Sequence, residues 1–363
     1  MKMLVVSNMF PDEKHPSYGT FVKKFTDEIE KLGIDYQLAV MHQATSKLKK
    51  IINYVFFYLG TFLKLVSKKY DVVYVHYASH SSIPVIWANT FKKLRIFINV
   101  HGSDVIPETH QQQRMQKNTR KILELSERII VPSEYFKNVV ENKYSPKGRI
   151  YIYPSGGIDP KLFYPYDEDK AKEARRKFGV DNGKPTIGMA CRISQGKGWD
   201  TFIEAIDLLG EDKNKANFIL VGSGPCEREL EDLIMGKGLQ KNINRYELLP
   251  QKDLADFYNA LTFSSSSSRL SESLGLVIVE AMACGKPVIS ADFAAPKYYI
   301  RDGINGYKFK VGNAEAMSNA IIRAINDYPT EKYKSLCYGA FETAREYFDI
   351  NQQSKLKELL TVE

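Results

Sequence analysis

The feature that most constrains the fold is an alternation of short runs rich in Val, Ile, Tyr and Phe with longer stretches of helical period. The first half contains MLVVSNMF, YDVVYVHY, RIFINV, RIIVPS and RIYIYPS, and the second contains TIGMAC, ANFILVGSG, a run ending at Ser264, and KPVISAD. Helical stretches such as FVKKFTDEIEKLG and WDTFIEAIDLLG separate most of these runs, and each ends on a glycine that suits a helix C-terminus. This order predicts an α/β fold with doubly wound parallel sheets.

A division of the chain is predicted at YPSGGIDPKLFYPYDEDK, which begins at Tyr153, contains three prolines and two glycines and has no regular period. Such a stretch is typical of a linker, and a new strand is expected soon after it. We therefore predict two Rossmann-like domains, residues 1–165 and 166–345. We expect a C-terminal helix at 346–363, and one option is that this helix crosses back to the first domain. Ligands are expected in the cleft between the domains, at the carboxyl ends of the strands.

Composition and charge narrow the class of protein. The 363 residues, 44% hydrophobic and 26% charged, are enough for two buried cores. The four cysteines lie far apart and have no CxxC spacing, which favours a reducing cytoplasm over a disulfide or zinc framework. The N-terminal MKMLVVSNMFP predicts a first strand and not a signal peptide. Residues 1–165 hold 24 Lys and Arg against 14 Asp and Glu, so this half favours an anionic partner.

The strongest chemical pattern is a pair of glutamates in ESLGLVIVEAMACGKPV. The apolar run ending on Gly285 predicts a buried helix, whose start at Ser273, Leu274 and Gly275 would expose backbone N–H groups to an anion such as a phosphate. Glu272 would precede the helix and Glu280 would lie about two turns in, where both can bind hydroxyls. The alternative is a capping carboxylate and an ordinary paired helix glutamate.

Two further segments carry polar groups at strand ends. Arg192 and Lys197 lie in a glycine-rich loop, CRISQGKGWD, where two cations suit a diphosphate. The alternative is that both are solvated loop charges. The loop does not match the Walker A pattern of ATPases and kinases. His101 and Asp104 follow the strand INV, where active-site loops lie in such folds, although a single histidine is more often structural. Gly19 lies at the start of the first helix. Either this helix start faces the cleft, where it could bind an anion, or Gly19 is an ordinary turn glycine. The histidines show no metal spacing, and no catalytic triad stands out.

Taken together, these segments resemble the family-four retaining glycosyltransferases, which have the GT-B fold of two facing Rossmann-like domains. The resemblance covers nearly the whole chain and includes Gly19, HGSD, VPSEYFKNVV, PSGGID, RISQGKG and VGSGP. Its most specific part is E-x7-E followed by AMACGKPVI.

The resemblance implies a role for each matching residue. His101 is expected to contact the donor sugar and the reacting centre, Glu272 to hold hydroxyls of the donor sugar, and Glu280 to hold the ribose hydroxyls. Arg192 and Lys197, with backbone amides at Ser273, Leu274 and Gly275 and near Gly19, are expected to bind the donor diphosphate, while Asp104 supports the loop of His101. No metal and no other cofactor is implied. A uridine nucleotide is favoured over a guanosine nucleotide.

The sequence departs from the family pattern at three positions. Ser268 and Arg269 stand where a Pro-Ser pair usually lies, Leu274 replaces a common phenylalanine, and Tyr298 stands where a further glutamate often precedes DGxNG. A GT-B phosphorylase or epimerase, a non-catalytic sugar-nucleotide-binding protein, and a nucleic-acid-binding protein are the competing functions. The last lacks a nucleic-acid motif, so we expect no nucleic-acid partner.

The stretch KLKKIINYVFFYLGTFLKLVSKK, residues 47–69, predicts an amphipathic helix that is too short and too interrupted to span a membrane. Its apolar arc is expected to exclude Phe57. Either the helix packs on the first sheet, or its apolar face enters a membrane surface while Lys49, Lys50, Lys64 and Lys68 contact anionic headgroups. The resemblance places the acceptor on the first domain. We therefore expect a saccharide or polyprenyl-diphosphate-linked acceptor, used at the inner face of the plasma membrane in capsule, exopolysaccharide or O-antigen synthesis.

Overall fold

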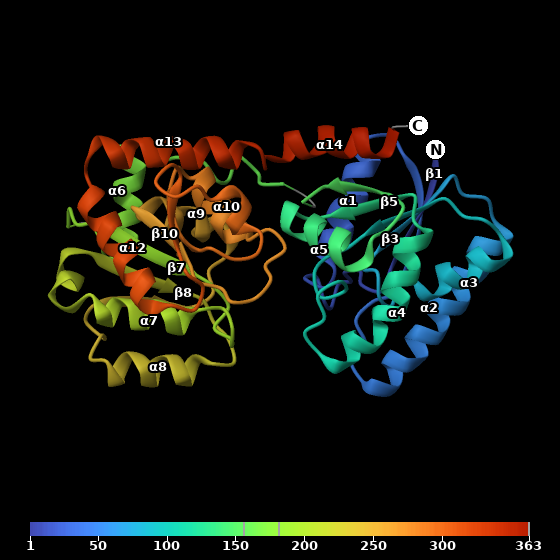
Figure 1. The fold of residues 1–363 in the computed structure, drawn as a ribbon, viewed down its shortest axis with the longest axis horizontal. Helices are drawn as coiled ribbons and strands as arrows, with labels where there is room; N and C mark the ends of the chain where they lie inside the picture. The colour runs from blue at the N-terminus through green and yellow to red at the C-terminus, as the bar shows by residue number, and fades with distance from the viewer. Residues whose placement is uncertain (155–156, 181, 362–363) are drawn as a thin grey trace. The chain divides into compact units, whose positions relative to one another are not determined.

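The protein is described by a computed structural model covering residues 1–154, 157–180 and 182–361. Ser155 and Gly156 of the PSGGID stretch lie outside the described residues. The chain divides into two compact units, the first formed by Met1–Gly156 with Gln352–Glu363 and the second by Gly157–Asn351. Each unit is built around one parallel sheet of six described strands (Figure 1).

The first unit has the strand order β2-β1-β3-β4-β5-β6, and every neighbouring pair is parallel. Its strands are β1 (Lys2–Ser7), β2 (Asp35–Val40), β3 (Val72–His76), β4 (Ile96–Asn99), β5 (Arg128–Val131) and β6 (Arg149–Ile152). Its helices are α1 (Thr20–Lys31), α2 (Lys47–Ser67), α3 (Ile83–Phe91), α4 (His110–Leu125), α5 (Glu134–Tyr144) and the part of α14 (Asp349–Thr361) from Gln352 onward.

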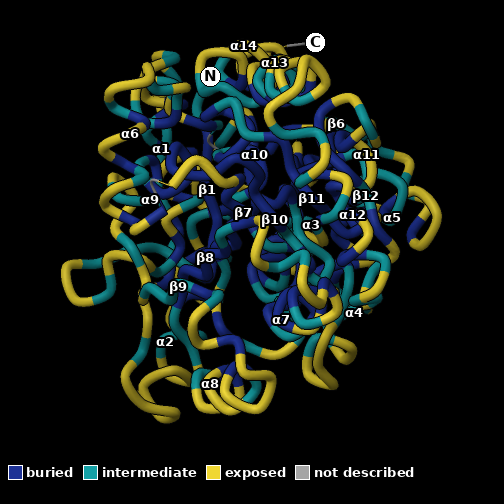
Figure 2. Tube along the Cα trace, turned by 90° about the vertical axis from the view of Figure 1, so that its left-hand side faces the viewer, coloured by how far each residue is buried: buried dark blue, intermediate teal, exposed yellow. Residues whose placement is uncertain are grey.

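The sheet of the first unit is buried on both faces because side chains alternate along each strand. In β1, Met3 and Val5 join one apolar layer, which also contains Phe25 of α1 and Leu356 of α14. Leu4 and Val6 point to the opposite layer, which α2, α3, α4 and α5 complete. The inner strand β1 is accordingly drawn mostly as buried in Figure 2, whereas the edge strands β2 and β6 are only partly buried.

The second unit repeats the plan with the order β12-β11-β10-β7-β8-β9. Its strands are β7 (Thr186–Ala190), β8 (Asn217–Val221), β9 (Ile243–Tyr246), β10 (Phe263–Ser266), β11 (Val288–Ala291) and β12 (Gly306–Phe309). Its helices are α6 (Glu168–Lys177), α7 (Trp199–Leu208), α8 (Glu227–Gly236), α9 (Gln251–Ala260), α10 (Leu276–Ala283), α11 (Pro296–Tyr299), α12 (Ala314–Asp327) and α13 (Glu331–Arg345), with a 3-10 turn, η1 (Gly210–Lys215). The predicted doubly wound α/β class is therefore confirmed.

The predicted lysine-flanked helix is α2, but its packing differs from the expected pattern. Phe57, expected to lie off the apolar side, is buried together with Thr61 and Leu65. Lys64, expected on the polar side, donates from Nζ to the backbone oxygen of Leu38 in β2 at 2.8 Å. Phe57 does lie off the wide apolar arc, on the side of Thr61, but this side and not the arc is the one that packs on the unit. One narrow face of α2 packs on the unit, and much of its remaining apolar surface is exposed.

Candidate functional site

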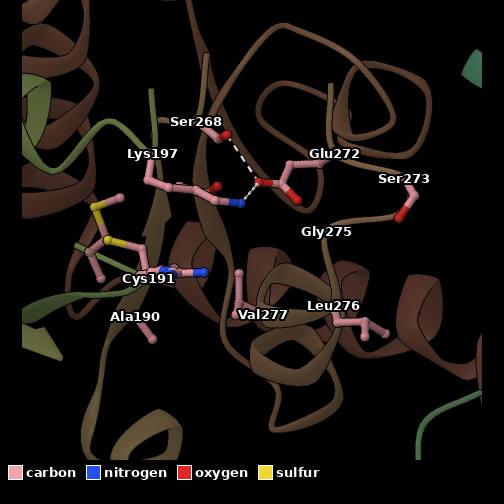
Figure 3. Close-up of a pocket in the computed structure, with 12 residues that line it drawn as sticks. Ala190, Cys191, Lys197, Ser268, Glu272, Ser273, Gly275, Leu276 and Val277 are labelled. Carbon is pink, nitrogen blue, oxygen red and sulfur yellow. Dashed lines mark hydrogen bonds and ion pairs between the residues drawn. The ribbon is translucent and has the colours of Figure 1, made fainter. Parts of the chain in front are cut away.

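A cavity of about 230 Å³ lies at the carboxyl ends of β7 and β10 in the second unit. Of the residues expected to bind a nucleotide sugar, Arg192, Lys197, Glu272, Ser273 and Gly275 line it (Figure 3). The other lining residues are Met189, Ala190, Cys191, Ser266, Ser268, Leu276 and Val277. Four separate segments of sequence thus converge where parallel sheets commonly bind ligands.

The loop that carries Lys197 packs closely against the loop that carries Glu272, and the contact is made by the backbone of two glycines. Gly198 is the N-cap residue of α7 and has φ 81°, and a Cβ at this position would lie 2.0 Å from the carbonyl oxygen of Ser267. The hydroxyl of Ser267 donates to the oxygen of Gly198 at 2.7 Å, and the amide of Arg269 donates to the oxygen of Gly196 at 2.7 Å. Only glycine permits this close approach with a left-handed backbone.

Lys197 and Glu272 are paired directly, with Nζ 2.6 Å from Oε1 (Figure 3). The Ser268 hydroxyl donates to the same carboxylate oxygen at 3.0 Å. Glu272 therefore has a fixed position, although its side chain keeps 28% of its surface exposed to solvent. A carboxylate and an ammonium group side by side on a cavity wall can bind a hydroxyl and a phosphate, respectively.

Arg269, the first departure from the family pattern, has a structural role. Its guanidinium donates to Asp200 Oδ2 at 2.6 Å and to the Thr201 hydroxyl at 3.2 Å, both in the first turn of α7. Together with its backbone bond to Gly196, this contact ties the strand-to-helix loop before α10 to α7. Arg269 thereby helps to hold Lys197 and Glu272 within reach of each other.

The start of α10 provides the cavity with backbone donors. Gly275 caps this helix with φ 81°, and the first N–H groups of a helix have no intrahelical partner. Leu274, the second departure, has a buried side chain, and its carbonyl accepts the Tyr299 hydroxyl at 2.7 Å. Its side chain therefore faces the interior, while Ser273 and Gly275 line the cavity. The positive end of a helix beside Arg192 and Lys197 favours a bound anion.

Glu280 lies on α10 but not among the residues that line the cavity. Its Oε2 accepts the hydroxyl of Tyr258 of α9 at 3.0 Å. Burial, and then the neighbouring carboxylate, raise the pKa of Tyr258 well above its ordinary value, so this phenol acts as a donor. Tyr258 was not predicted from the sequence, because a tyrosine in a helix is more often an ordinary core residue.

In the first unit, the predicted residues lie in the loops that follow β1 and β4, two strands that flank β3 in the sheet. Gly19 precedes α1, and a Cβ there would lie 2.7 Å from the carbonyl carbon of Met9. Two residues later, the ring of Phe21 packs 4.2 Å from that of His101. Asp104 accepts the amides of Ala78, His101 and Gly102 at 2.9–3.0 Å, so it supports the histidine loop. Burial raises the pKa of Asp104, against the effect of these donors.

Two other features of the described residues bear on binding. No group of three or more His, Cys, Asp and Glu side chains in residues 1–154, 157–180 and 182–361 is arranged to hold a metal ion. No helix in the same ranges is long and apolar enough to cross a membrane. Among the predicted surface lysines, Lys49, Lys50 and Lys68 are exposed, whereas Lys64 is turned toward β2.

Solved structures define the class. The Anabaena protein HepE, solved in complex with UDP, superposes with a TM-score of 0.78 over 99% of this chain and 100% of its own, at 18% identity. WaaG, a glycosyltransferase involved in lipopolysaccharide biosynthesis, gives 0.72 over 100% of both chains at 15% identity. The protein therefore has the GT-B fold.

The family is shown by models that match on both sides of the linker. The model described as "Glycosyl transferases group 1" matches residues 170–342, and "Glycosyltransferase Family 4" matches residues 20–161. The chain belongs to the family-four glycosyltransferases, as its resemblance implied. A D-inositol 3-phosphate glycosyltransferase of Catenulispora acidiphila is 32% identical over 52% of this chain; the match spans 46%, about half, of that relative's length.

Proposed function

We propose that the protein is a retaining glycosyltransferase that moves a sugar from a nucleoside diphosphate sugar to a saccharide acceptor. The observation that carries this proposal is the convergence of Arg192, Lys197, Glu272 and the start of α10 on one cavity. HepE was solved with UDP and glucose, which supports a UDP-sugar over a GDP-sugar as the donor. Glu280 is assigned to the ribose, and Tyr258 holds its carboxylate.

The proposed chemistry follows from these charges. The bond between the anomeric carbon and the diphosphate oxygen breaks, and the acceptor oxygen forms a new bond on the same face of the sugar. The acceptor proton passes to the departing phosphate oxygen. Arg192, Lys197 and the backbone donors before α10 stabilise the negative charge that builds on the diphosphate, so this proposal needs no metal. His101 and Glu272 are assigned to the donor sugar, and neither acts as a base.

The proposed acceptor is lipid-linked, and the surface of α2 and α3 supports it. Nine large apolar residues of these adjacent helices are exposed: Leu48, Ile51, Ile52, Val55, Phe56, Leu59, Leu63, Trp87 and Phe91. We call this set the α2–α3 surface. Aromatic side chains of α2 and α3 pack against each other. The ring centroids of Tyr58 and Trp87 are 6.1 Å apart, and those of Phe62 and Phe91 are 5.7 Å apart.

The charges around the α2–α3 surface favour an anionic bilayer. No acidic residue occurs from Gln37 to Tyr70, while six lysines do. Exposed apolar side chains beside lysines are typical of helices that lie in the plane of a membrane. A relative from Streptococcus pneumoniae, named alpha-monoglucosyldiacylglycerol synthase, is 25% identical over 61% of this chain and 49% of its own. We propose peripheral attachment to the cytoplasmic membrane face and a role in capsule, exopolysaccharide or O-antigen synthesis.

The test is transfer from a panel of UDP- and GDP-sugars to soluble saccharides and to polyprenyl-diphosphate-linked saccharides, with and without EDTA. Proton NMR of the product reports the anomeric configuration. We expect retention, turnover that EDTA does not change, and faster transfer to the lipid-linked acceptor. An inverted product would overturn the retaining mechanism, and equal rates on short soluble sugars would overturn the lipid-linked acceptor. Release of a sugar 1-phosphate only when free phosphate is added would indicate a phosphorylase instead.

A further inference from the structure

We propose that His76, the last residue of β3, is a positioning residue that fixes the ring orientation and the tautomer of His101. The two rings lie at the carboxyl ends of the paired strands β3 and β4. His76 Nδ1 is 3.1 Å from His101 Nε2, and the rings are stacked with an interplanar angle of 23°. No role of His76 was predicted from the sequence, and only the catalytic consequence of this role rests on the proposed function.

The surroundings of His76 leave its ring one hydrogen-bonding direction. Its side chain is fully buried, and the rings of Phe25 and Tyr74 lie 4.8 and 5.0 Å away. Within the described residues, His76 Nε2 has no hydrogen-bond partner. The hydrogen bond with His101 is therefore the polar interaction that fixes the orientation of the His76 ring.

The proton between the two rings determines what His101 can offer a substrate. Burial keeps both imidazoles neutral, so each has one N–H group and one bare nitrogen. If His101 were the donor, the proton of His76 would lie on Nε2, as a buried N–H without an acceptor. Buried N–H groups left unpaired are rare and costly. The arrangement we assign has His76 Nδ1–H donating to His101 Nε2.

This arrangement leaves His101 with its proton on Nδ1. This nitrogen is then a hydrogen-bond donor and not a base, which would suit contact with a sugar or phosphate oxygen in the proposed function. The amide of His101 is held by Asp104, and one face of its ring is covered by Phe21. His76 adds the remaining constraint, because it decides which ring nitrogen carries the proton.

Long-range proton–nitrogen correlation spectra of protein labelled with ¹⁵N-histidine test the inference without substrate. We expect both His76 and His101 to be protonated on Nδ1. A His101 signal protonated on Nε2 would overturn the proposal. Because the free protein is measured, this result is independent of whether any sugar nucleotide proves to be a donor.

Variants separate positioning from folding. In His76→Phe, we expect His101 to lose its single tautomer and, with an active donor, kcat/KM to fall about tenfold. His76→Asn, whose amide nitrogen can replace Nδ1–H, should restore one tautomer and most of the activity. His80→Phe, at a histidine that packs on Tyr54, is the matched control and should leave the His101 spectrum unchanged. If His76→Phe does not fold, His76→Asn decides: a mixed His101 tautomer in that variant would contradict the role.

Discussion

The ammonium group of Lys197 lies 2.6 Å from the carboxylate of Glu272, although the two residues are assigned to different parts of the donor. In the unliganded protein each compensates the other's charge. Binding a diphosphate beside Lys197 would exchange this ion pair for a stronger contact and free one oxygen of Glu272 for a sugar hydroxyl. The pair thus gives a physical reason why phosphate binding and sugar binding should depend on each other.

The first prediction concerns the charge of Lys197. We expect Lys197→Met to weaken binding of UDP by roughly tenfold to a hundredfold, because a charged hydrogen bond to phosphate is lost. Stability should change by less than about 1 kcal/mol, since the pair is partly solvated. Isothermal titration calorimetry measures the affinity. Lys334→Met removes an exposed lysine paired with Glu331 in the same unit and is the control; equal affinities for the two variants would contradict the clamp.

The second prediction concerns the glycine that brings the two loops together. Gly198→Ala places a Cβ 2.0 Å from the oxygen of Ser267 at a left-handed φ, so we expect a loss of at least about 3 kcal/mol in the free energy of unfolding. Gly236→Ala, in α8 with open space around it, should instead stabilise by about 0.5–1 kcal/mol. Urea unfolding of both variants checks this contrast. Similar losses in the two variants would show that the close approach does not matter.

The central strands of both sheets were predictable because they are buried on both faces. MLVVS in β1 and VVYVH in β3 contain almost continuous apolar residues, as parallel strands require. Three strands were not predicted from the sequence: β2, β9 and β12, with the sequences DYQLAV, INRY and GYKF. All three are edge strands with one paired neighbour. Their mixed polar patterns carry no clear period, so only pairing in the folded chain defines them.

The site was predictable where local sequence determines local geometry. Arg192, Lys197 and Glu272 lie in strand-to-helix loops whose glycines can be recognised in the sequence, and these residues do meet at one cavity. The supporting contacts were not predictable, because Arg269–Asp200 joins residues 69 positions apart and Tyr258–Glu280 joins residues 22 apart. Contacts of this kind depend on which helices become neighbours in the folded chain, and no sequence motif indicates that.

The third prediction tests the support of Glu280. Tyr258→Phe removes the hydroxyl that donates to Oε2 at 3.0 Å but keeps the buried ring. We expect UDP binding to weaken by roughly fivefold to tenfold, since the carboxylate becomes less well oriented for the ribose, and stability to fall by about 1–2 kcal/mol. Binding of free diphosphate should stay the same. A loss that is equal for UDP and diphosphate would show that Tyr258 does not act through the ribose.

The fourth prediction concerns pH. Burial lowers the pKa of His101 to about 3, so the ring stays neutral in the folded protein while an unfolded histidine gains a proton below about pH 6.5. The unfolded state then binds more protons, and the free energy of unfolding should fall as the pH drops from 6.5 toward 3, by up to about 1.4 kcal/mol per pH unit for this group. Urea unfolding at several pH values should show a shallower fall for His101→Asn than for the unchanged protein. Parallel curves would mean that His101 titrates normally.

The last prediction addresses the α2–α3 surface. Phe56 and Leu63 are 70% and 51% exposed on α2, so replacing both with serine removes apolar area without opening the core. We expect the double variant to lose most co-sedimentation with phosphatidylglycerol vesicles, while the free energy of unfolding stays within about 0.5 kcal/mol. Lys49→Glu with Lys50→Glu should weaken the same binding and make it insensitive to salt, because headgroup attraction is screened. Met235→Ser, an equally exposed apolar position in the second unit, is the control. Unchanged vesicle binding by the Phe56 and Leu63 variant would remove the membrane role of this surface, and turnover on soluble acceptors should be the same for all these variants.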